Sequence, residues 1–161
     1  MTLVKIVTGC LLTFVLATPA LARTTTVHVK LWDHGGMMDM ASNMQWGMGM
    51  HGNKNMAMMG ISLDKTSVPA GNVSFAVTNV SKDTIHEMLV APIKGSDATL
   101  PFIASENRVD ESASGDLGEV SELDPGKKGE LTLDLKPGLY VLFCNVPGHF
   151  VAGMWTTIKV K

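Results

Sequence analysis

Three side chains that bind soft metal ions lie close together near the C-terminus. Cys144, His149 and Met154 offer a thiolate, an imidazole and a thioether, with four residues between each ligand and the next. Two histidines, one cysteine and a weak axial methionine make up a mononuclear copper site for electron transfer. The run therefore predicts a copper loop that needs one more imidazole from upstream, and His86 is the obvious candidate.

Each of these four residues has a simpler interpretation when it is taken alone. A buried cysteine behaves as a small hydrophobic residue, a histidine can be held by structural hydrogen bonds, and a methionine can fill the core. The combination favours metal binding. The only other cysteine, Cys10, lies in the N-terminal residues 1–22, which we expect to be cleaved off on export, so Cys144 would be the one thiol left. A lone thiol in an oxidising compartment is an oxidation hazard unless it is buried or bound to a metal.

The N-terminus has the composition of an export signal. Lys5 precedes an apolar stretch over residues 6–16, and Ala20 and Ala22 supply small residues at the cleavage positions. We expect residues 1–22 to be a signal peptide cleaved after Ala22, residues 23–161 to form one domain, and the protein to be periplasmic. No stretch is long and apolar enough to predict a membrane span. The formal net charge of −2 gives no reason to expect a nucleic acid as partner.

Alternating apolar and polar residues, separated by turns, predict an all-β fold. Val27, Val29 and Leu31 alternate with His28 and Lys30, as in a strand with one buried face. Glycine and proline turns separate several such segments, which favours an antiparallel sandwich or barrel. The predicted strands cover residues 24–31, 61–63, 73–78, 85–90, 131–135, 139–144 and 154–160. Residues 93–124 are polar, acidic and without clear period, so we expect an irregular crossover with room for a short helix.

With this pattern of strands and ligands, residues 61–161 resemble the cupredoxin family. The loop spacing from Cys144 to Met154 is similar to that of rusticyanin-type sequences, and residues 79–88 resemble the family's first-histidine strand. The resemblance implies a Greek-key β-sandwich or barrel and one type 1 copper, blue or green. Its ligands would be His86, Cys144, His149 and Met154.

The resemblance also implies roles for the neighbours of the ligands, with one departure from the family. Pro147 and Gly148 would shape the loop, and Phe143 would keep water from the metal. Many cupredoxins place Asn or Ser after the first histidine, where it bonds to the cysteine loop, but this chain has Glu87. An ionised carboxylate cannot donate a hydrogen bond to a thiolate. Met88 is either a core residue or a competing thioether.

A segment rich in methionine and histidine, residues 33–60, interrupts the predicted strands. It holds nine of the twelve methionines, and we expect a flexible N-terminal insertion. Thioethers are soft ligands that prefer Cu(I), and histidine extends the range to Cu(II). The segment therefore predicts additional, secondary copper binding. An adaptable hydrophobic linker for a protein partner is the alternative. The secondary candidates are His34, Met37, Met38, Met40, Met44, Met48, Met50, His51, Met56, Met58 and Met59.

An export signal, a Met-rich segment and a cupredoxin-like domain together resemble the CopI-type periplasmic copper-tolerance cupredoxins. The resemblance implies a copper-binding protein for copper tolerance or homeostasis, with a redox or copper-transfer protein as partner. A soluble electron carrier is the alternative, because it would use the same four ligands. A multicopper enzyme needs further histidines, and the sequence has five histidines and no His-x-His pair. We therefore expect no enzyme, and oxidation of Cu(I) at the single centre is a secondary hypothesis.

Overall fold

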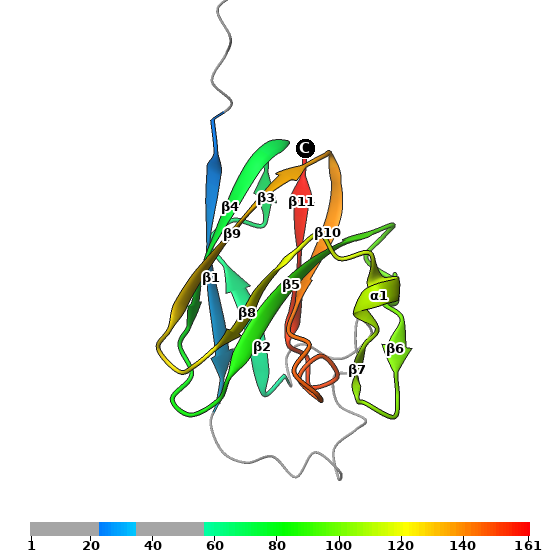
Figure 1. The fold of residues 1–161 in the computed structure, drawn as a ribbon. Coiled ribbons are helices and arrows are strands. Elements are labelled where there is room, and N and C mark those ends of the chain that lie inside the picture. Colours follow the sequence, from blue (N-terminus) through cyan, green and yellow to red (C-terminus); the bar gives the residue numbers. More distant parts are fainter. Residues whose placement is uncertain (1–22, 35–56) are drawn as a thin grey trace, which may run out of the picture.

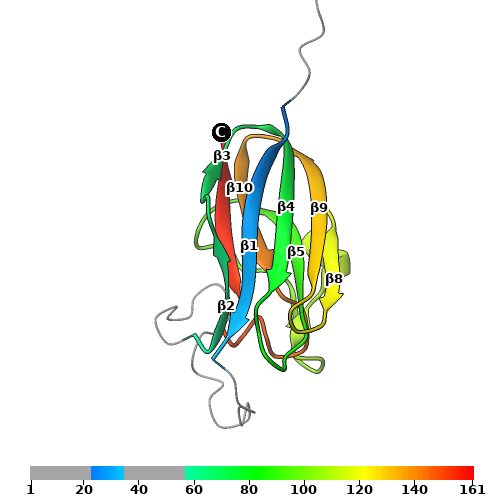
Figure 2. The same ribbon diagram turned by 90° about the vertical axis from the view of Figure 1, so that its left-hand side faces the viewer.

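Two β-sheets packed face to face make up the fold in the computed structural model, which describes residues 23–34 and 57–161 (Figure 1). One sheet has the order β2-β1-β4-β9 and faces the viewer in Figure 2. Its strands are β1 (Thr25–Asp33), β2 (Met59–Leu63), β4 (Gly71–Asn79) and β9 (Lys128–Leu135). The predicted signal peptide, residues 1–22, and most of the Met/His-rich segment lie outside the described residues.

The second sheet has the order β3-β11-β10-β5-β8. Its strands are β3 (Ser67–Val68), β5 (His86–Ile93), β8 (Glu119–Leu123), β10 (Gly138–Phe143) and β11 (Trp155–Val160). The connection from β5 to β8 also carries a two-stranded ribbon and one turn of helix: β6 (Phe102–Ile103), β7 (Arg108–Val109) and α1 (Glu111–Ser114). Within residues 23–34 and 57–161, no helix has the length and apolar character that a membrane span requires.

The main core fills the space between the two sheets. Val27, Val29 and Leu31 of β1 are at most 1% exposed, and Val73 and Phe75 of β4 are fully buried. These residues occupy alternate positions because successive side chains of a strand point to opposite faces. The alternation that predicted these strands therefore corresponds to the buried face of the first sheet.

A second apolar cluster lies on the outer face of the other sheet. Leu89, Val141, Phe143, Phe150 and Trp155 belong to it. The side chains of Phe143 and Phe150 meet edge to face, with ring centroids 5.9 Å apart. Because β5 and β10 have apolar neighbours on both faces, residues 88–91 are continuously buried. A strand buried on both faces reads as an unbroken apolar run.

The structure corrects the predicted fold in three places. Residues 93–124 are not only an irregular crossover, because they include β8, which pairs antiparallel with β5. The sandwich is not purely antiparallel, since β1 pairs parallel with β4 and β11 pairs parallel with β3. Asp33, Met59 and Gly60, expected within the flexible segment, belong to the paired strands β1 and β2. The all-β sandwich itself is confirmed.

Candidate metal centre

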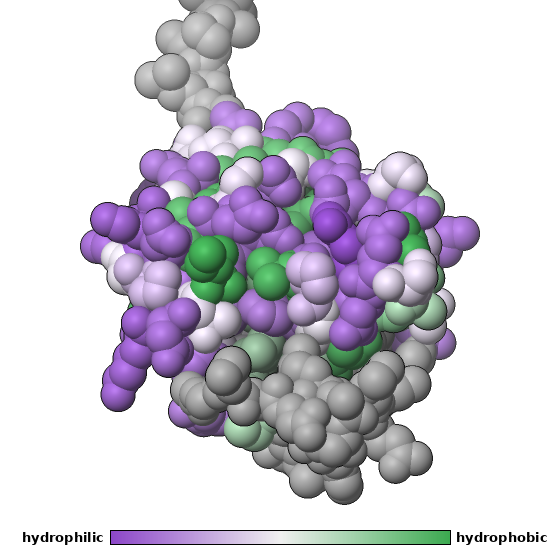
Figure 3. Space-filling view, turned by 60° about the horizontal axis from the view of Figure 1, so that its bottom comes forward, coloured by the Kyte–Doolittle hydropathy of each residue, from purple (hydrophilic) through white to green (hydrophobic). Residues whose placement is uncertain are grey.

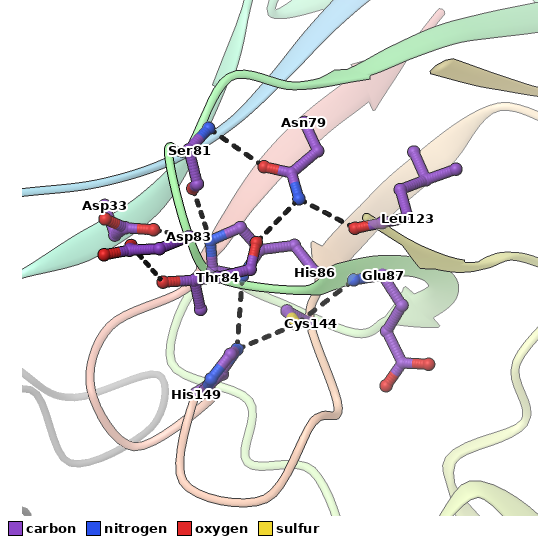
Figure 4. Close-up of polar contacts among 10 residues, drawn as sticks. All are labelled: Asp33, Asn79, Ser81, Asp83, Thr84, His86, Glu87, Leu123, Cys144 and His149. Carbon is purple, nitrogen blue, oxygen red and sulfur yellow. Dashed lines mark hydrogen bonds and ion pairs between the residues drawn. The ribbon is translucent and has the colours of Figure 1, made fainter. Parts of the chain in front are cut away.

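Three of the four predicted ligands meet at one end of the sandwich. One ligand atom from each of His86, Cys144 and His149 lies within 4.8 Å of the others, and all three residues are buried. The Nδ1 atoms of the two histidines are 3.2 Å apart, and Nδ1 of His149 is 3.4 Å from the sulfur of Cys144 (Figure 4). Two imidazoles and one thiolate that converge in this way match the donor set of a type 1 copper site.

The sheet determines where these side chains lie. His86 is the first residue of β5, and Cys144 follows the last residue of β10, its antiparallel neighbour. His149 belongs to the loop between β10 and β11, at the lower end of the molecule in Figure 1. Two neighbouring strands therefore bring distant parts of the sequence to one place, and rigid strands hold a site more precisely than loops alone.

Met154 closes the same loop. Its backbone carbonyl accepts a hydrogen bond from the Cys144 amide at 3.0 Å, and its own amide donates to the His149 carbonyl at 3.0 Å. The side chain is fully buried in the core cluster that also includes Cys144. These contacts place Met154 beside both other loop residues, and its role as axial ligand stays a prediction.

Burial makes the Cys144 side chain a poor thiolate unless a cation is present. Burial raises the pKa of its thiol to about 12, against the opposing effect of hydrogen bonds from the Glu87 and Val146 backbone amides. The Glu87 amide lies 3.5 Å from the sulfur. The two N–H groups can stabilise the thiolate, but a buried negative charge also needs a positive partner. A metal ion held by Cys144 would supply that positive partner.

The surroundings of the two histidines favour the neutral imidazole. The pKa of His149 is lowered to about 4, mainly because the side chain is buried and also because His86 lies beside it. Burial likewise lowers the pKa of His86, and the nearby Asp33 opposes that effect. A neutral imidazole keeps one nitrogen lone pair free for a metal. The donor set therefore fits a copper ion, which would supply one-electron chemistry between Cu(I) and Cu(II).

The distal nitrogen of His86 has two contacts that sequence analysis missed. Its Nε2 lies 3.1 Å from Oδ2 of Asp33 and 2.8 Å from Oγ of Ser81. Asp33 ends β1, in the other sheet, so the contact crosses the sandwich (Figure 4). No local pattern signals it, because the two residues are brought together only by the packing of the sheets.

Asn79 organises the connection from β4 to β5 that carries Ser81. It is fully buried. Its side-chain oxygen accepts from the Ser81 amide at 3.0 Å, and its amide group donates to the carbonyls of Thr84 and Leu123. An asparagine that bonds two residues ahead is typical of a turn. The predicted turn after β4 therefore also positions a contact of the first histidine.

Asn145 anchors the ligand loop on its other side. Its side chain exchanges two hydrogen bonds with the backbone of Val109, at 2.7 and 3.0 Å, and also donates to Glu111 at 2.7 Å. The Gly148 amide donates to the Asn107 carbonyl at 2.7 Å. Gly148 has φ of +87°, a backbone conformation that favours glycine. The β6–β7 ribbon therefore supports the loop, and Gly148 shapes it as expected.

The structure shows the surroundings of three neighbours of the ligands, Glu87, Met88 and Phe143. The carboxylate of Glu87 points away from Cys144 (Figure 4), so only its backbone amide reaches the sulfur. Burial and the neighbouring Glu119, Glu122 and Glu111 raise the pKa of that carboxyl group to about 7. Met88 is fully buried in the core cluster that includes Cys144. Phe143 packs in the outer cluster instead, so it does not share the apolar surroundings of the sulfur.

The structure describes only three of the secondary copper candidates. His34 is exposed, with its ring centroid 5.1 Å from that of Trp32, and its amide donates to the Met58 carbonyl. Met58 is 38% exposed, whereas Met59 is 7% exposed and packs in the core. The structure therefore gives Met59 a packing role. The others lie outside the described residues: Met37, Met38, Met40, Met44, Met48, Met50, His51 and Met56.

Comparison with known proteins agrees with this geometry. Residues 46–161 match a family described as copper binding proteins, plastocyanin/azurin family. Reduced auracyanin from Roseiflexus castenholzii has a similar fold, with a TM-score of 0.51 and 19% identity over 87% of this chain and 98% of auracyanin. Rusticyanin from Thiobacillus ferrooxidans gives a TM-score of 0.56 and 17% identity over 86% of this chain and 77% of rusticyanin. No curated protein is significantly similar in sequence.

Proposed function

This chain belongs to the plastocyanin/azurin family of copper-binding proteins, and we propose that it serves copper tolerance and homeostasis in the periplasm. In this proposal His86, Cys144, His149 and Met154 form a single type 1 copper site. The Met/His-rich segment collects further copper and delivers it to that site or to a partner protein. Residues 1–22 would direct export.

The observation that carries this proposal is the position of the two ends of the segment. At the N-terminal end of the segment, Asp33 of β1 contacts His86. Near the C-terminal end, Met59 of β2 pairs with Asp33. A side chain built on Gly153 of the ligand loop would lie 2.8 Å from Cβ of Ala57. Residues 35–56 therefore lie in the chain between a residue that contacts His86 and a residue that lies against the ligand loop.

This attachment favours copper transfer within one molecule. A tethered ligand group acts at an effective concentration set by the length of its tether, and short tethers give values on the order of millimolar. Methionine ligands need no deprotonation and prefer Cu(I), whereas the thiolate and imidazoles of the buried site also suit Cu(II). A weak, soft collector beside a rigid site is chemically suited to capture copper and pass it on.

The test replaces the collector without disturbing the strands. Seven methionines and one histidine between residues 35 and 56 are changed to serine in the full chain, so that Asp33 and Met59 keep their pairing. We expect the copper content to fall to one ion per chain with an unchanged visible spectrum, and cells to survive less added copper. Cys144→Ser is the matched control, which loses the spectrum and keeps the additional copper. Unchanged copper content and survival in the serine variant would refute the collector.

A soluble electron carrier is the second candidate, favoured by the surface beside His86. Val80 and Ile85, in the connection from β4 to β5, are 47% and 44% exposed. Apolar residues next to a buried redox site can contact a partner protein. The visible described part of this end of the molecule is mostly hydrophilic, with hydrophobic residues in small patches (Figure 3). An apolar patch surrounded by polar residues is typical of the surface with which a protein binds a partner transiently.

The two candidates differ in their cellular consequences. If loss of the gene impairs respiration or photosynthesis and leaves copper survival intact, the carrier function is correct. If copper survival falls and electron transport continues, the tolerance function is correct. A non-enzymatic, copper-binding role agrees with the family. The described part of the chain contains one group of His and Cys side chains that could hold a metal ion, formed by His86, Cys144 and His149. Oxidation of Cu(I) at this single centre would be measured as oxygen consumption with added Cu(I).

A further inference from the structure

We infer that Asp33 is a positioning residue for the proposed copper ligand His86, and that its hydrogen bond stabilises Cu(II) relative to Cu(I) at the site. The inference rests on the proposed copper site and adds a control of its affinity and reduction potential. It depends on one contact across the sandwich, between Oδ2 of Asp33 and Nε2 of His86 at 3.1 Å.

The contact selects one tautomer of His86. An ionised carboxylate only accepts hydrogen bonds, so Nε2 must carry the proton that faces Asp33. Nδ1 then carries the lone pair, and Nδ1 is the atom that lies 3.2 Å from Nδ1 of His149. The hydroxyl oxygen of Ser81, 2.8 Å from Nε2, can accept from the same N–H group. The distal contacts therefore leave the lone pair of His86 directed to the group of metal ligands.

The surroundings make this hydrogen bond strong. The His86 side chain is fully buried, and that of Asp33 is 7% exposed. A hydrogen bond to an ionised acceptor is shorter and stronger than one between neutral groups, and exclusion of water strengthens it further. Oriented contacts of this type raise the basicity of a ligating imidazole.

The strands hold Asp33 in place. It is opposite Met59 in the β1–β2 pair. Two residues earlier, the Leu31 carbonyl accepts from the Val80 amide at 2.8 Å, in the connection that also carries Ser81. The carboxylate and the hydroxyl are therefore held by one continuous hydrogen-bonded framework, which keeps the imidazole in a fixed orientation.

A more basic imidazole and a nearby negative charge both stabilise the ion of higher charge. Loss of such a contact typically lowers metal affinity about 10–100-fold. We expect Cu(II) affinity to fall more than Cu(I) affinity, because the negative carboxylate attracts the doubly charged ion more strongly than the singly charged one. Each tenfold loss of Cu(II) affinity relative to Cu(I) raises the reduction potential by about 59 mV.

The test compares two variants that remove the same charge at different places. Asp33→Asn keeps the shape of the side chain and removes its charge. Asp83→Asn removes a charge from an exposed carboxylate in the same connection as Ser81, and Asp83 bonds to Thr84 rather than to His86. Both are made in the full chain, loaded with copper and measured for Cu(II) affinity, Cu(I) affinity and reduction potential. The absorption band of the copper–thiolate pair reports that the site is intact.

We expect Asp33→Asn to lose at least about tenfold in Cu(II) affinity, with a smaller loss for Cu(I) and a higher potential. Asp83→Asn should change affinity about twofold or less, because exposed charges are screened. Ser81→Ala, which leaves one acceptor on Nε2, should raise the potential by a smaller amount and provides the test if Asp33→Asn does not fold.

Two results would overturn the inference. One is an unchanged potential in Asp33→Asn, or in Ser81→Ala where Asp33→Asn does not fold, and the other is an equal change in Asp33→Asn and Asp83→Asn, which would indicate charge alone. Either failure leaves the copper–thiolate band of the wild type in place. Absence of that band in the wild type would instead refute the proposed copper site.

Discussion

Gly153 in the ligand loop provides a direct test of how the loop packs against the residues that follow the Met/His-rich segment. Its φ is +98°, a conformation that side chains with a Cβ rarely adopt, and a Cβ there would lie 2.8 Å from Cβ of Ala57. Gly153→Ala therefore adds two costs, backbone strain and a steric contact that the rigid side chain of Ala57 cannot avoid.

The two costs can be separated with a second glycine. Gly126 has φ of +76° and no atom within 4 Å of an added Cβ, so Gly126→Ala introduces the strain alone. A left-handed conformation costs roughly 1–2 kcal/mol per residue, and a less flexible unfolded chain offsets about 0.4–1 kcal/mol of it. Overpacking adds about 1–3 kcal/mol. We expect the free energy of unfolding to fall by about 1 kcal/mol in Gly126→Ala and by about 2–4 kcal/mol in Gly153→Ala.

The assay is urea unfolding of the copper-free protein, followed by the visible spectrum of each variant after copper addition. Because Gly153 precedes Met154, the copper–thiolate band should shift in Gly153→Ala and stay unchanged in Gly126→Ala. Equal destabilisation of the two variants, with identical spectra, would show that Ala57 does not pack against the ligand loop, and the structural argument for the tethered collector would fail.

Three further outcomes follow from the site. Asn145→Ala should lower the free energy of unfolding by about 2–4 kcal/mol in urea, because it leaves buried polar groups of Val109 without partners; a loss below about 0.5 kcal/mol would contradict this. Binding of Cu(II) at the Cys144 site at pH 7 should release one proton in a pH-indicator titration, because the pKa of the Cys144 thiol is about 12 and that of His149 about 4; release of two would show a protonated histidine. The pKa of Glu87 is raised from 4.5 to about 7, so between these pH values the folded protein binds more protons than the unfolded chain. The free energy of unfolding should therefore fall from pH 5 to pH 8, and Glu87→Gln should remove that fall.

The sequence predicted most of the elements that hold the site. Alternation located β1, β4, β9, β10 and β11, since each of them buries mainly one face or adjoins a clear turn. It missed β8, in which only Val120 is buried, because a single apolar residue gives no period. It also missed the parallel pairing of β1 with β4, since strand order depends on contacts between distant residues.

The same distinction applies to the metal centre. Cys144, His149 and Met154 could be predicted because ligand type and spacing within one loop are local properties. His86 followed as the upstream imidazole that such a site still needs, and the resemblance agreed with it. The contact of Asp33 with His86 could not, because it joins the two sheets. The packing of Met59 was missed for a related reason, as its neighbours make it look like part of a methionine-rich segment, whereas pairing with Asp33 places it in the core.

The central claim is that Cys144 binds copper together with two imidazoles, and the visible spectrum of the full chain during titration with Cu(II) tests it most directly. An intense copper–thiolate absorption should rise until one ion is bound at the buried site, and Cys144→Ser should abolish it. Copper binding without that absorption, or an identical spectrum in Cys144→Ser, would show that the metal does not occupy the group formed by His86, Cys144 and His149.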